Sequence, residues 1–446
     1  MIRRLTAVLG PFLLSSAPLA AGEPPRFDWG FAATVLTQTA PSFTNPYEGT
    51  NSFRNEGSAK PAATFLATLF GAVRLWEGAW LSLQPEFSDG SGVGGGTGIA
   101  AYPNQDVLRI PAIGGKPYIA RVFLQQTFPL GPAGEPPEAP RRPEEKFLPA
   151  GNHLFAFPGR RLEITFGKIC LADVFDGNDF VRDAHHGFWS WGLVNNGAWD
   201  FAADTRGYTW GLTVAYEGGP VAARAGAYMM PEVANGPTYD HDLAHAHGVN
   251  AEIEWDFAPD RQGAVRLLGY VNMADMGSYE ESLTLAAASG TPPDITTTRE
   301  TGRRKWGLAL NAQLRLGHDL GAFSRLGWND GATETFAYTE IDRTFQVGMA
   351  LAGEAWKRPD DTLFAAVAVS GLSGAHRRYL EAGGLGFQLG DGQLTYGLET
   401  VLEVDYAANL TKAISAGLDA QLVVNPGYNR DRGPIAVFGA RLHAHF

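Results

Sequence analysis

The chain has 446 residues with 47 acidic and 35 basic side chains, which gives a formal net charge of −12 at pH 7. This balance leaves no basic surface for nucleic acid, so the partners should be neutral or cationic. Cys170 is the only cysteine. The chain therefore forms no intramolecular disulfide, and its stability must come from the architecture of the fold.

The first 21 residues have the pattern of a secretory signal peptide. Arg3 and Arg4 precede an apolar run that ends near Leu14, and small residues follow as far as Ala21. A short buried helix explains these charges and small residues less well. We expect export across the inner membrane, followed by an N-terminal segment with the first strand in residues 22–60. No later run of about eighteen apolar residues predicts a transmembrane helix.

From about residue 61 the chain alternates between apolar and polar residues. In residues 305–314 one parity gives Trp306, Leu308 and Leu310, whereas the other gives Lys305 and Asn311. The same pattern recurs in residues 221–229, 265–273, 414–424 and 435–446. One face suits lipid and the other suits water, which is typical of a transmembrane β-strand.

A soluble β-sandwich also alternates, but two features favour a membrane barrel. Small, charged and polar residues dominate the inward parity, where a soluble core would need large apolar side chains. Aromatic residues gather near segment ends, as expected for girdles at the membrane interfaces; they include Trp76, Trp80, Trp210, Tyr216, Trp255, Trp306, Trp328, Trp356 and Tyr406.

The connections between these segments alternate between short and long, like periplasmic turns and extracellular loops. Counting the segments predicts an all-β fold, a transmembrane antiparallel β-barrel of about 16 strands in residues 61–446 with extracellular loops folded inward to constrict the pore. One proline-rich segment at residues 129–159 breaks the rhythm. We interpret it as a flexible periplasmic insertion, and a tolerated insertion without a role is favoured over a specific partner site.

The connection at residues 171–206 is unusually long and rich in aromatic, amide and charged residues. We expect it to fold into the barrel and narrow the pore. A pyranose has an apolar ring face and a rim of hydroxyls, so aromatic rings can stack on it while polar groups exchange hydrogen bonds. The candidate sugar contacts in this loop are Phe188, Trp189, Trp191, Asn195, Asn196, Trp199, Asp200 and Arg206.

Charged residues of inward parity extend this candidate site onto the barrel wall. Opposed cations and anions in a pore set its selectivity together with its radius. The cations are Arg121, Arg224, Arg266 and Arg325, and the anions are Glu86, Glu252, Glu254, Glu399 and Glu403.

Each of these residues also has a purely structural interpretation, which the sequence leaves open. Trp189 and Trp191 can pack the loop against the wall, and Arg121 and Arg325 can form ion pairs across the lumen. Asp200 and Arg206 are favoured for hydrogen bonding within the loop over ligand contact.

Other candidate sites are weaker. The histidines at 185, 186, 241, 245 and 247 fit no zinc signature and are interpreted as solvated. Calcium at Asp173, Asp176 and Asp179 is possible but is not predicted, because the spacing lacks the calcium-loop pattern. The sequence contains no G-x-S-x-G or Cys-His nucleophile arrangement. We therefore expect neither a cofactor nor an enzyme.

The last segment ends on Phe446, an aromatic in the strand itself. Outer-membrane proteins resemble one another in this ending, which their assembly machinery reads. Phe446 therefore predicts that machinery as a partner.

Four segments carry a family resemblance: GNDFVRDAHHGFWSWGLVNNGAWDFAADTRGYTWG, GGPVAARAGAYMMPEVANG, AHAHGVNAEIEW and HRRYLEAGGLGFQLGDGQLTYGLETVLEVDY. They resemble the carbohydrate-selective porin (OprB) family of Gram-negative outer membranes. The resemblance implies a sixteen-stranded barrel with inward loops that passes monosaccharides such as glucose, with lipid and lipopolysaccharide around it. A general diffusion porin, an outer-membrane barrel enzyme and a soluble carbohydrate-binding module remain alternatives, and the choice between monomer and homotrimer stays open.

Overall fold

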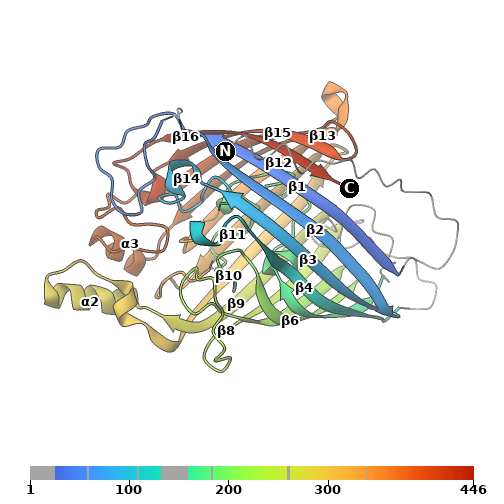
Figure 1. Ribbon diagram of the computed structural model, residues 1–446, viewed down its shortest axis with the longest axis horizontal. Coiled ribbons are helices and arrows are strands. Elements are labelled where there is room, and N and C mark those ends of the chain that lie inside the picture. Colours follow the sequence, from blue (N-terminus) through green and yellow to red (C-terminus); the bar gives the residue numbers. More distant parts are fainter. Residues whose placement is uncertain are drawn as a thin grey trace.

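Sixteen β-strands close into one antiparallel barrel in the part of the chain that the computed structural model describes (Figure 1). The structure describes residues 26–57, 60–107, 110–131, 159–181, 184–258, 262–337 and 339–446. Each strand pairs with its neighbours in sequence, and β1 pairs with β16 from Ala32 opposite His445 to Thr39 opposite Phe438. The predicted barrel of about sixteen strands is confirmed. The signal-peptide prediction and most of the proline-rich insertion lie outside the described residues.

The strands differ in length around the barrel. Their bounds are β1 (Phe27–Thr39), β2 (Ala62–Trp76), β3 (Ala79–Gly90), β4 (Lys116–Pro129), β5 (Arg161–Ile169), β6 (Thr209–Gly218), β7 (Val221–Met229), β8 (His247–Ala258), β9 (Gly263–Met276), β10 (Glu300–Leu316), β11 (Leu320–Asn329), β12 (Arg343–Gly353), β13 (Arg358–Gly371), β14 (Glu399–Asn409), β15 (Ile414–Val424) and β16 (Ile435–His445).

The strands bury their polar parity and expose their apolar parity. On β10, Trp306 and Leu308 are 46% and 48% exposed, whereas Lys305, Asn311 and Gln313 are buried. This reverses the pattern of a soluble barrel, because the outer face meets hydrocarbon and the inner face meets polar loops and water. The inward and outward assignments predicted from the alternation are therefore confirmed for this strand.

Aromatic residues stand at the ends of the outer face, with one exception among those predicted. Trp306 and Trp328 form an edge-to-face pair with ring centroids 4.9 Å apart, and Phe446 packs on Trp29 at 5.6 Å. Trp80 is instead buried. It was expected on the outer girdle, but it takes the inward parity of β3 and packs against Phe123, with ring centroids 5.6 Å apart.

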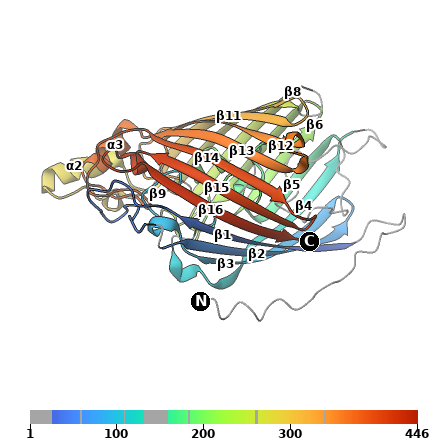
Figure 2. The same ribbon diagram turned by 90° about the horizontal axis from the view of Figure 1, so that it is seen from above.

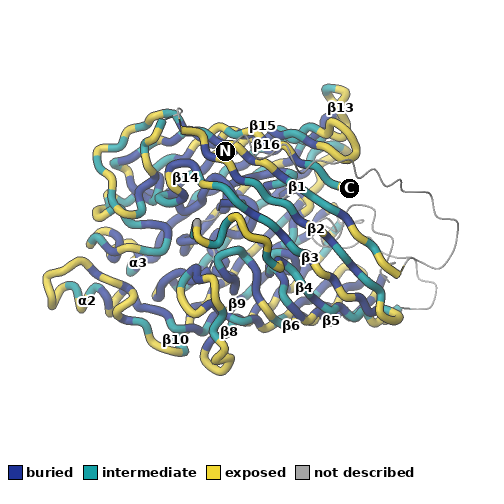
Figure 3. The backbone as a smooth tube through the Cα atoms, viewed as in Figure 1, coloured by how far each residue is buried: buried dark blue, intermediate teal, exposed yellow. Residues whose placement is uncertain are grey.

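Short turns lie at one end of the barrel and long connections at the other, where α2 (Tyr279–Ser289) and α3 (Gly374–Glu381) project (Figures 1 and 2). The residues of α2 are largely exposed (Figure 3). Ser278 caps α2 by accepting a hydrogen bond from the N–H of Glu281. No described helix is long and apolar enough to cross a membrane.

We expect the outer face to reject charge most strongly at mid-strand. Leu310→Arg should lower the free energy of unfolding by about 2–4 kcal/mol, whereas Leu316→Arg near the strand end should cost about 1 kcal/mol or less. Reversible urea unfolding in lipid vesicles measures both. Equal costs at the two positions would contradict the assignment of this face to lipid.

Candidate functional site

Two long connections fold into the barrel and are held there by buried carboxylates of the wall. They are L2 (residues 91–115) and L3 (residues 170–208). Glu403 on β14 accepts hydrogen bonds from the backbone N–H groups of Trp189 and Ser190 in L3. Glu399, on the same strand, accepts from Ala100 and Ala101 in L2 at 3.0 and 2.7 Å. A buried carboxylate is stable only with such donors, so these contacts fix both loops in the lumen.

L3 supplies carboxylates of its own to this network. Asp176 accepts from Arg325 Nε at 3.1 Å and from Asn311 Nδ2 at 2.7 Å. Within the loop, it also accepts from the backbone N–H of Asn196 at 2.7 Å. The first half of L3 is thereby attached to β10 and β11.

Asp200 joins L3 to the next long connections. It accepts from the backbone N–H groups of Phe336 and Ala337 at 2.9 and 2.8 Å. Its carboxylate also lies 3.3 Å from Nζ of Lys305, whose side chain is fully buried. Asp200 is therefore a structural anchor that lies away from the open lumen.

The tryptophans of L3 divide between the wall and the open side of the loop. Trp189 and Trp199 are fully buried, and their indole N–H groups donate to Asp405 at 3.1 Å and Asn250 at 2.8 Å. Trp191 belongs to the short helix α1 (Trp191–Val194) and lines a cavity instead. Its indole donates to the carbonyl of Asn104 at 2.8 Å. Phe188 packs between Phe323 and Phe364, away from the cavity.

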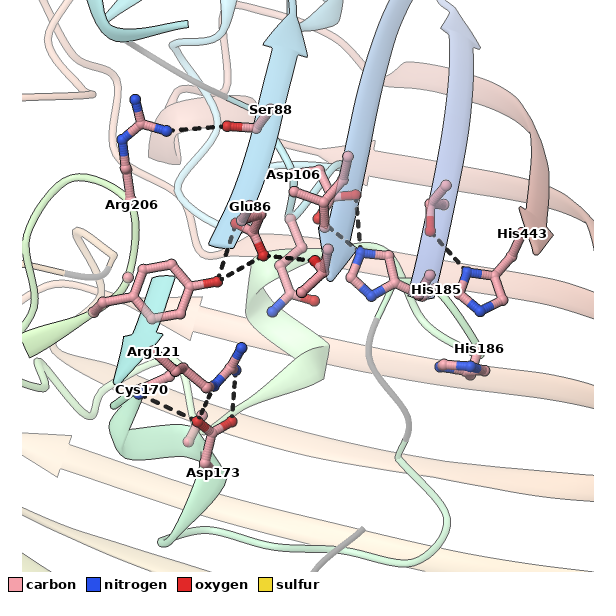
Figure 4. A pocket seen from close by; sticks show the side chains of 18 of the residues that line it. Glu86, Ser88, Asp106, Arg121, Cys170, Asp173, His185, His186, Arg206 and His443 are labelled. Atoms are coloured by element: carbon pink, nitrogen blue, oxygen red, sulfur yellow. Dashed lines mark hydrogen bonds and ion pairs between the residues drawn. The ribbon is translucent and has the colours of Figure 1, made fainter. Parts of the chain in front are cut away.

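The cavity has a volume of about 910 Å³ and lies between L3 and the inner face of β1 to β4 (Figure 4). It extends to the short-turn end, where Arg358 and Lys412 line it. Five of the predicted residues line this space: Glu86, Arg121, Trp191, Asn195 and Arg206. The others do not line this space and are buried: Trp189, Asn196, Trp199, Asp200, Arg224, Glu252, Glu254, Arg266, Arg325, Glu399 and Glu403.

One stretch of the cavity wall combines aromatic rings with charged groups. Arg206 Cζ lies 3.5 Å from the centre of the Tyr118 ring, and its Nη1 donates to Ser88 Oγ at 3.2 Å. Glu86 accepts from the hydroxyls of Tyr118 and Tyr208. Burial, followed by the Glu86 carboxylate, raises the pKa of Tyr208 well above its ordinary range, so this hydroxyl stays protonated and donates.

Arg121 forms the other charged element of this wall. Its guanidinium makes a bidentate ion pair with Asp173, with Nε–Oδ2 at 2.7 Å and Nη2–Oδ1 at 2.9 Å. The same guanidinium lies 5.1 Å from the centre of the Tyr208 ring. Such planar pairing holds both side chains in one orientation, which gives the cavity a rigid edge.

The remaining wall arginines are neutralised by their neighbours. Arg224 contacts Glu217, Glu252 and Glu254 at 2.8 to 2.9 Å. Arg266 lies 3.2 Å from Glu254. Both arginines are buried. They contribute no open charge to the cavity.

Tyr118, Tyr208, Ser88 and a set of histidines also line the cavity, and these tyrosines and Ser88 were not among the residues predicted from sequence. Tyr118 pairs with Glu86 across β3 and β4, beyond a register shift that the alternation of residues does not show. His185 and His186 in L3 lie beside His443, with ring centroids 6.1 and 4.7 Å away. They therefore border the channel, whereas His245 pairs with Asp242 at the surface.

The three aspartates considered for calcium have separate protein partners. Asp173 pairs with Arg121, Asp176 pairs with Arg325, and Asp179 accepts from Gln313 at 2.7 Å. In the described part of the chain, no three His, Cys, Asp or Glu side chains form a group that could hold a metal ion.

Comparison with known proteins gives a family and a fold. The model of "Carbohydrate-selective porin, OprB family" matches residues 72–446. Porin AaxA of Chlamydia abortus is 25% identical over 294 residues, which cover 64% of this chain and 54% of that protein. The chain thus spans about half the length of the curated relative that it matches.

Solved structures with the same fold cover nearly the whole chain. The high-pH structure of Pseudomonas putida OprB has a TM-score of 0.67 at 15% identity and covers 94% of both chains. The outer-membrane channel DcaP of Acinetobacter baumannii has a TM-score of 0.50 at 10% identity, covering 94% of this chain and 97% of that one. At these identities the likeness establishes the fold alone.

We expect Glu403→Gln to loosen L3, because each carboxylate oxygen accepts one backbone N–H and the NH2 group of glutamine cannot accept. The free energy of unfolding should fall by about 1.5–3 kcal/mol, and the open-channel current should become noisier. Glu300→Gln, at a residue whose side chain is 73% exposed, should change stability by about 0.5 kcal/mol or less. Equal effects of the two substitutions would argue against the anchoring role.

Proposed function

We propose that the passage beside L3 conducts neutral monosaccharides. The proposal starts from the family, because the chain belongs to the carbohydrate-selective porins of the OprB family. Family and fold support a carbohydrate channel of the outer membrane. The proposal adds the route through the barrel, the constriction and a preference for glucose and similar sugars.

The route follows from how unevenly the lumen is filled. Hydrogen bonds attach L3 to four strands. Glu252 on β8, Asn311 on β10 and Glu403 on β14 contact the loop, and Asn196 of the loop donates to a carbonyl of β11. The cavity lies on the opposite side of the loop, against β1 to β4. A solute that enters from the long-loop end therefore passes between L3 and these four strands.

The observation that carries the proposal is the group formed by Arg206, Tyr118 and Glu86. A sugar ring can pack against the parts of Tyr118 and Trp191 that line the cavity, while its hydroxyls exchange hydrogen bonds with Glu86, Arg206 and Ser88. A pathway of this kind must bind well enough to admit the solute and weakly enough to release it. The hydroxyls of a neutral polyol can exchange hydrogen bonds with both the carboxylate and the guanidinium of this group.

The first test is single-channel conductance in a planar bilayer, titrated with glucose and then with an uncharged non-sugar of similar size. Saturable block by glucose alone supports the selective channel. Steady conductance that is indifferent to both solutes would mean a general diffusion porin and would overturn the proposed preference.

Tyr118→Leu should weaken the glucose block, because it removes both a stacking surface and a hydroxyl that donates to Glu86. We expect the dissociation constant from current block to rise by roughly threefold to tenfold. Phe345→Leu makes a similar change on the lipid-facing side, where Phe345 is 44% exposed, and should leave the block unchanged. An unchanged block in Tyr118→Leu would remove Tyr118 from the route.

Cys170 offers a separate test of the route, because it lines the same cavity. A positively charged methanethiosulfonate reagent should lower the single-channel current, and saturating glucose should slow this reaction. Cys170→Ser abolishes the thiol chemistry and serves as the control. If the modified thiol left the current unaltered, the solute path would have to lie elsewhere in the barrel.

A further inference from the structure

On one side of β4, the barrel wall ends early at the long-loop end. Strands β5 and β6 reach only Ile169 and Thr209 at the long-loop end, and their pairing with β4 stops at Val122 opposite Lys168. β4 continues to Lys116 and pairs there only with β3. Residues 116–121 of β4 therefore have no strand partner on the side that faces β5 and β6.

A hollow of about 370 Å³ lies at this gap. Four of its lining residues, Tyr118, Asp204, Thr205 and Arg206, also line the main cavity. Figure 4 shows Arg206 beside Ser88 at the edge of that cavity. The hollow is called the β4 notch below, and it borders the sugar passage from the outside of the wall.

The β4 notch reaches the lipid-facing side of the barrel. Val122, Lys168 and Trp210 are direct cross-strand partners on β4, β5 and β6, so their side chains share one face. That face is the outer one, because Trp210 is 38% exposed and Phe166, two residues before Lys168, is 60% exposed. Lys168 is thus a cation of outward parity at the level where an aromatic girdle meets the headgroups.

The charges of the β4 notch do not cancel. The one carboxylate in its lining, Asp204, lies 3.4 Å from Lys168 Nζ. It also accepts from Tyr239 Oη at 2.7 Å and from the backbone N–H of Arg206 at 2.9 Å. Arg206 makes no ion pair within the described chain; its guanidinium contacts Tyr118, Ser88 and the carbonyl of Ile113. Two cations against one anion leave one positive charge.

We propose that the β4 notch binds the phosphate-bearing headgroup of an anionic lipid in the outer leaflet. Lys168 and Arg206 provide the cationic contacts, as basic residues do at anionic membrane surfaces. Ile119, which is 41% exposed, and Trp210 contact the start of an acyl chain. This site adjoins the proposed sugar route and shares Arg206 and Tyr118 with it, but its preference for an anionic lipid does not depend on whether that route selects glucose.

The test is native mass spectrometry of the full chain, released from detergent after incubation with an equimolar mixture of phosphatidylglycerol and phosphatidylcholine. The wild type should retain phosphatidylglycerol over phosphatidylcholine by roughly fivefold for each cation that contacts the phosphate. Lys168→Gln should reduce this preference by roughly fivefold, and Lys168→Arg should keep it.

Arg304→Gln is the matched control. Arg304 is exposed on the outer parity of β10, two residues before Trp306, and lies outside the β4 notch. It should retain the wild-type preference. The shift in gel mobility on heating verifies that each variant is folded. If a variant fails to fold, the comparison of the two lipids on the wild type still tests the site.

Three outcomes would overturn the proposal. Equal retention of the two lipids by the wild type would mean that the notch does not recognise the anionic headgroup. Displacement of the lipid by inorganic phosphate alone at millimolar concentration would make the site a free-anion site. Loss of an oligomer in Lys168→Gln without a change in lipid preference would assign the notch to contact between copies of the chain.

Discussion

The structure depends on the contact between buried carboxylates and the backbone N–H groups of loops that enter the barrel. A sixteen-stranded barrel is too wide for wall side chains to fill. Glu403 and Glu399 accept pairs of consecutive N–H groups from L3 and L2. A carboxylate without donors and a backbone amide without an acceptor are each costly in a buried site. Each group therefore satisfies the other, and the loop becomes part of the core.

This arrangement determines which charges a solute can meet. Most wall arginines are used in fixing the lumen: Arg224 contacts three glutamates, and Arg325 holds Asp176. Arg206 remains without an ion pair in the described structure and lies on an aromatic ring at the edge of the cavity. A barrel with many inward charges thus presents a small number of them to its passage.

The alternation of residues predicted the wall, and the composition of L3 predicted that it enters the barrel. The direction of each side chain within L3 could not be predicted. Trp189 and Trp191 are two residues apart, yet Ser190 caps the turn of α1 between them, and only the second indole lines the cavity. Tyr118 was missed for a different reason: the β3–β4 register shifts between Gln84 and Pro85. Parity counted from Arg121 therefore places Tyr118 on the wrong face.

The passage residues already satisfy one another when the channel is empty of sugar. Glu86 accepts from Thr68 and Tyr208, and Arg206 donates to Ser88. A sugar hydroxyl that binds here must exchange with an existing protein hydrogen bond, so the net gain per contact is small. Stacking on aromatic faces then supplies much of the preference for a sugar over another neutral solute. Exchange between nearly equal hydrogen bonds allows both recognition and rapid release, which a channel requires and a tight binding protein does not.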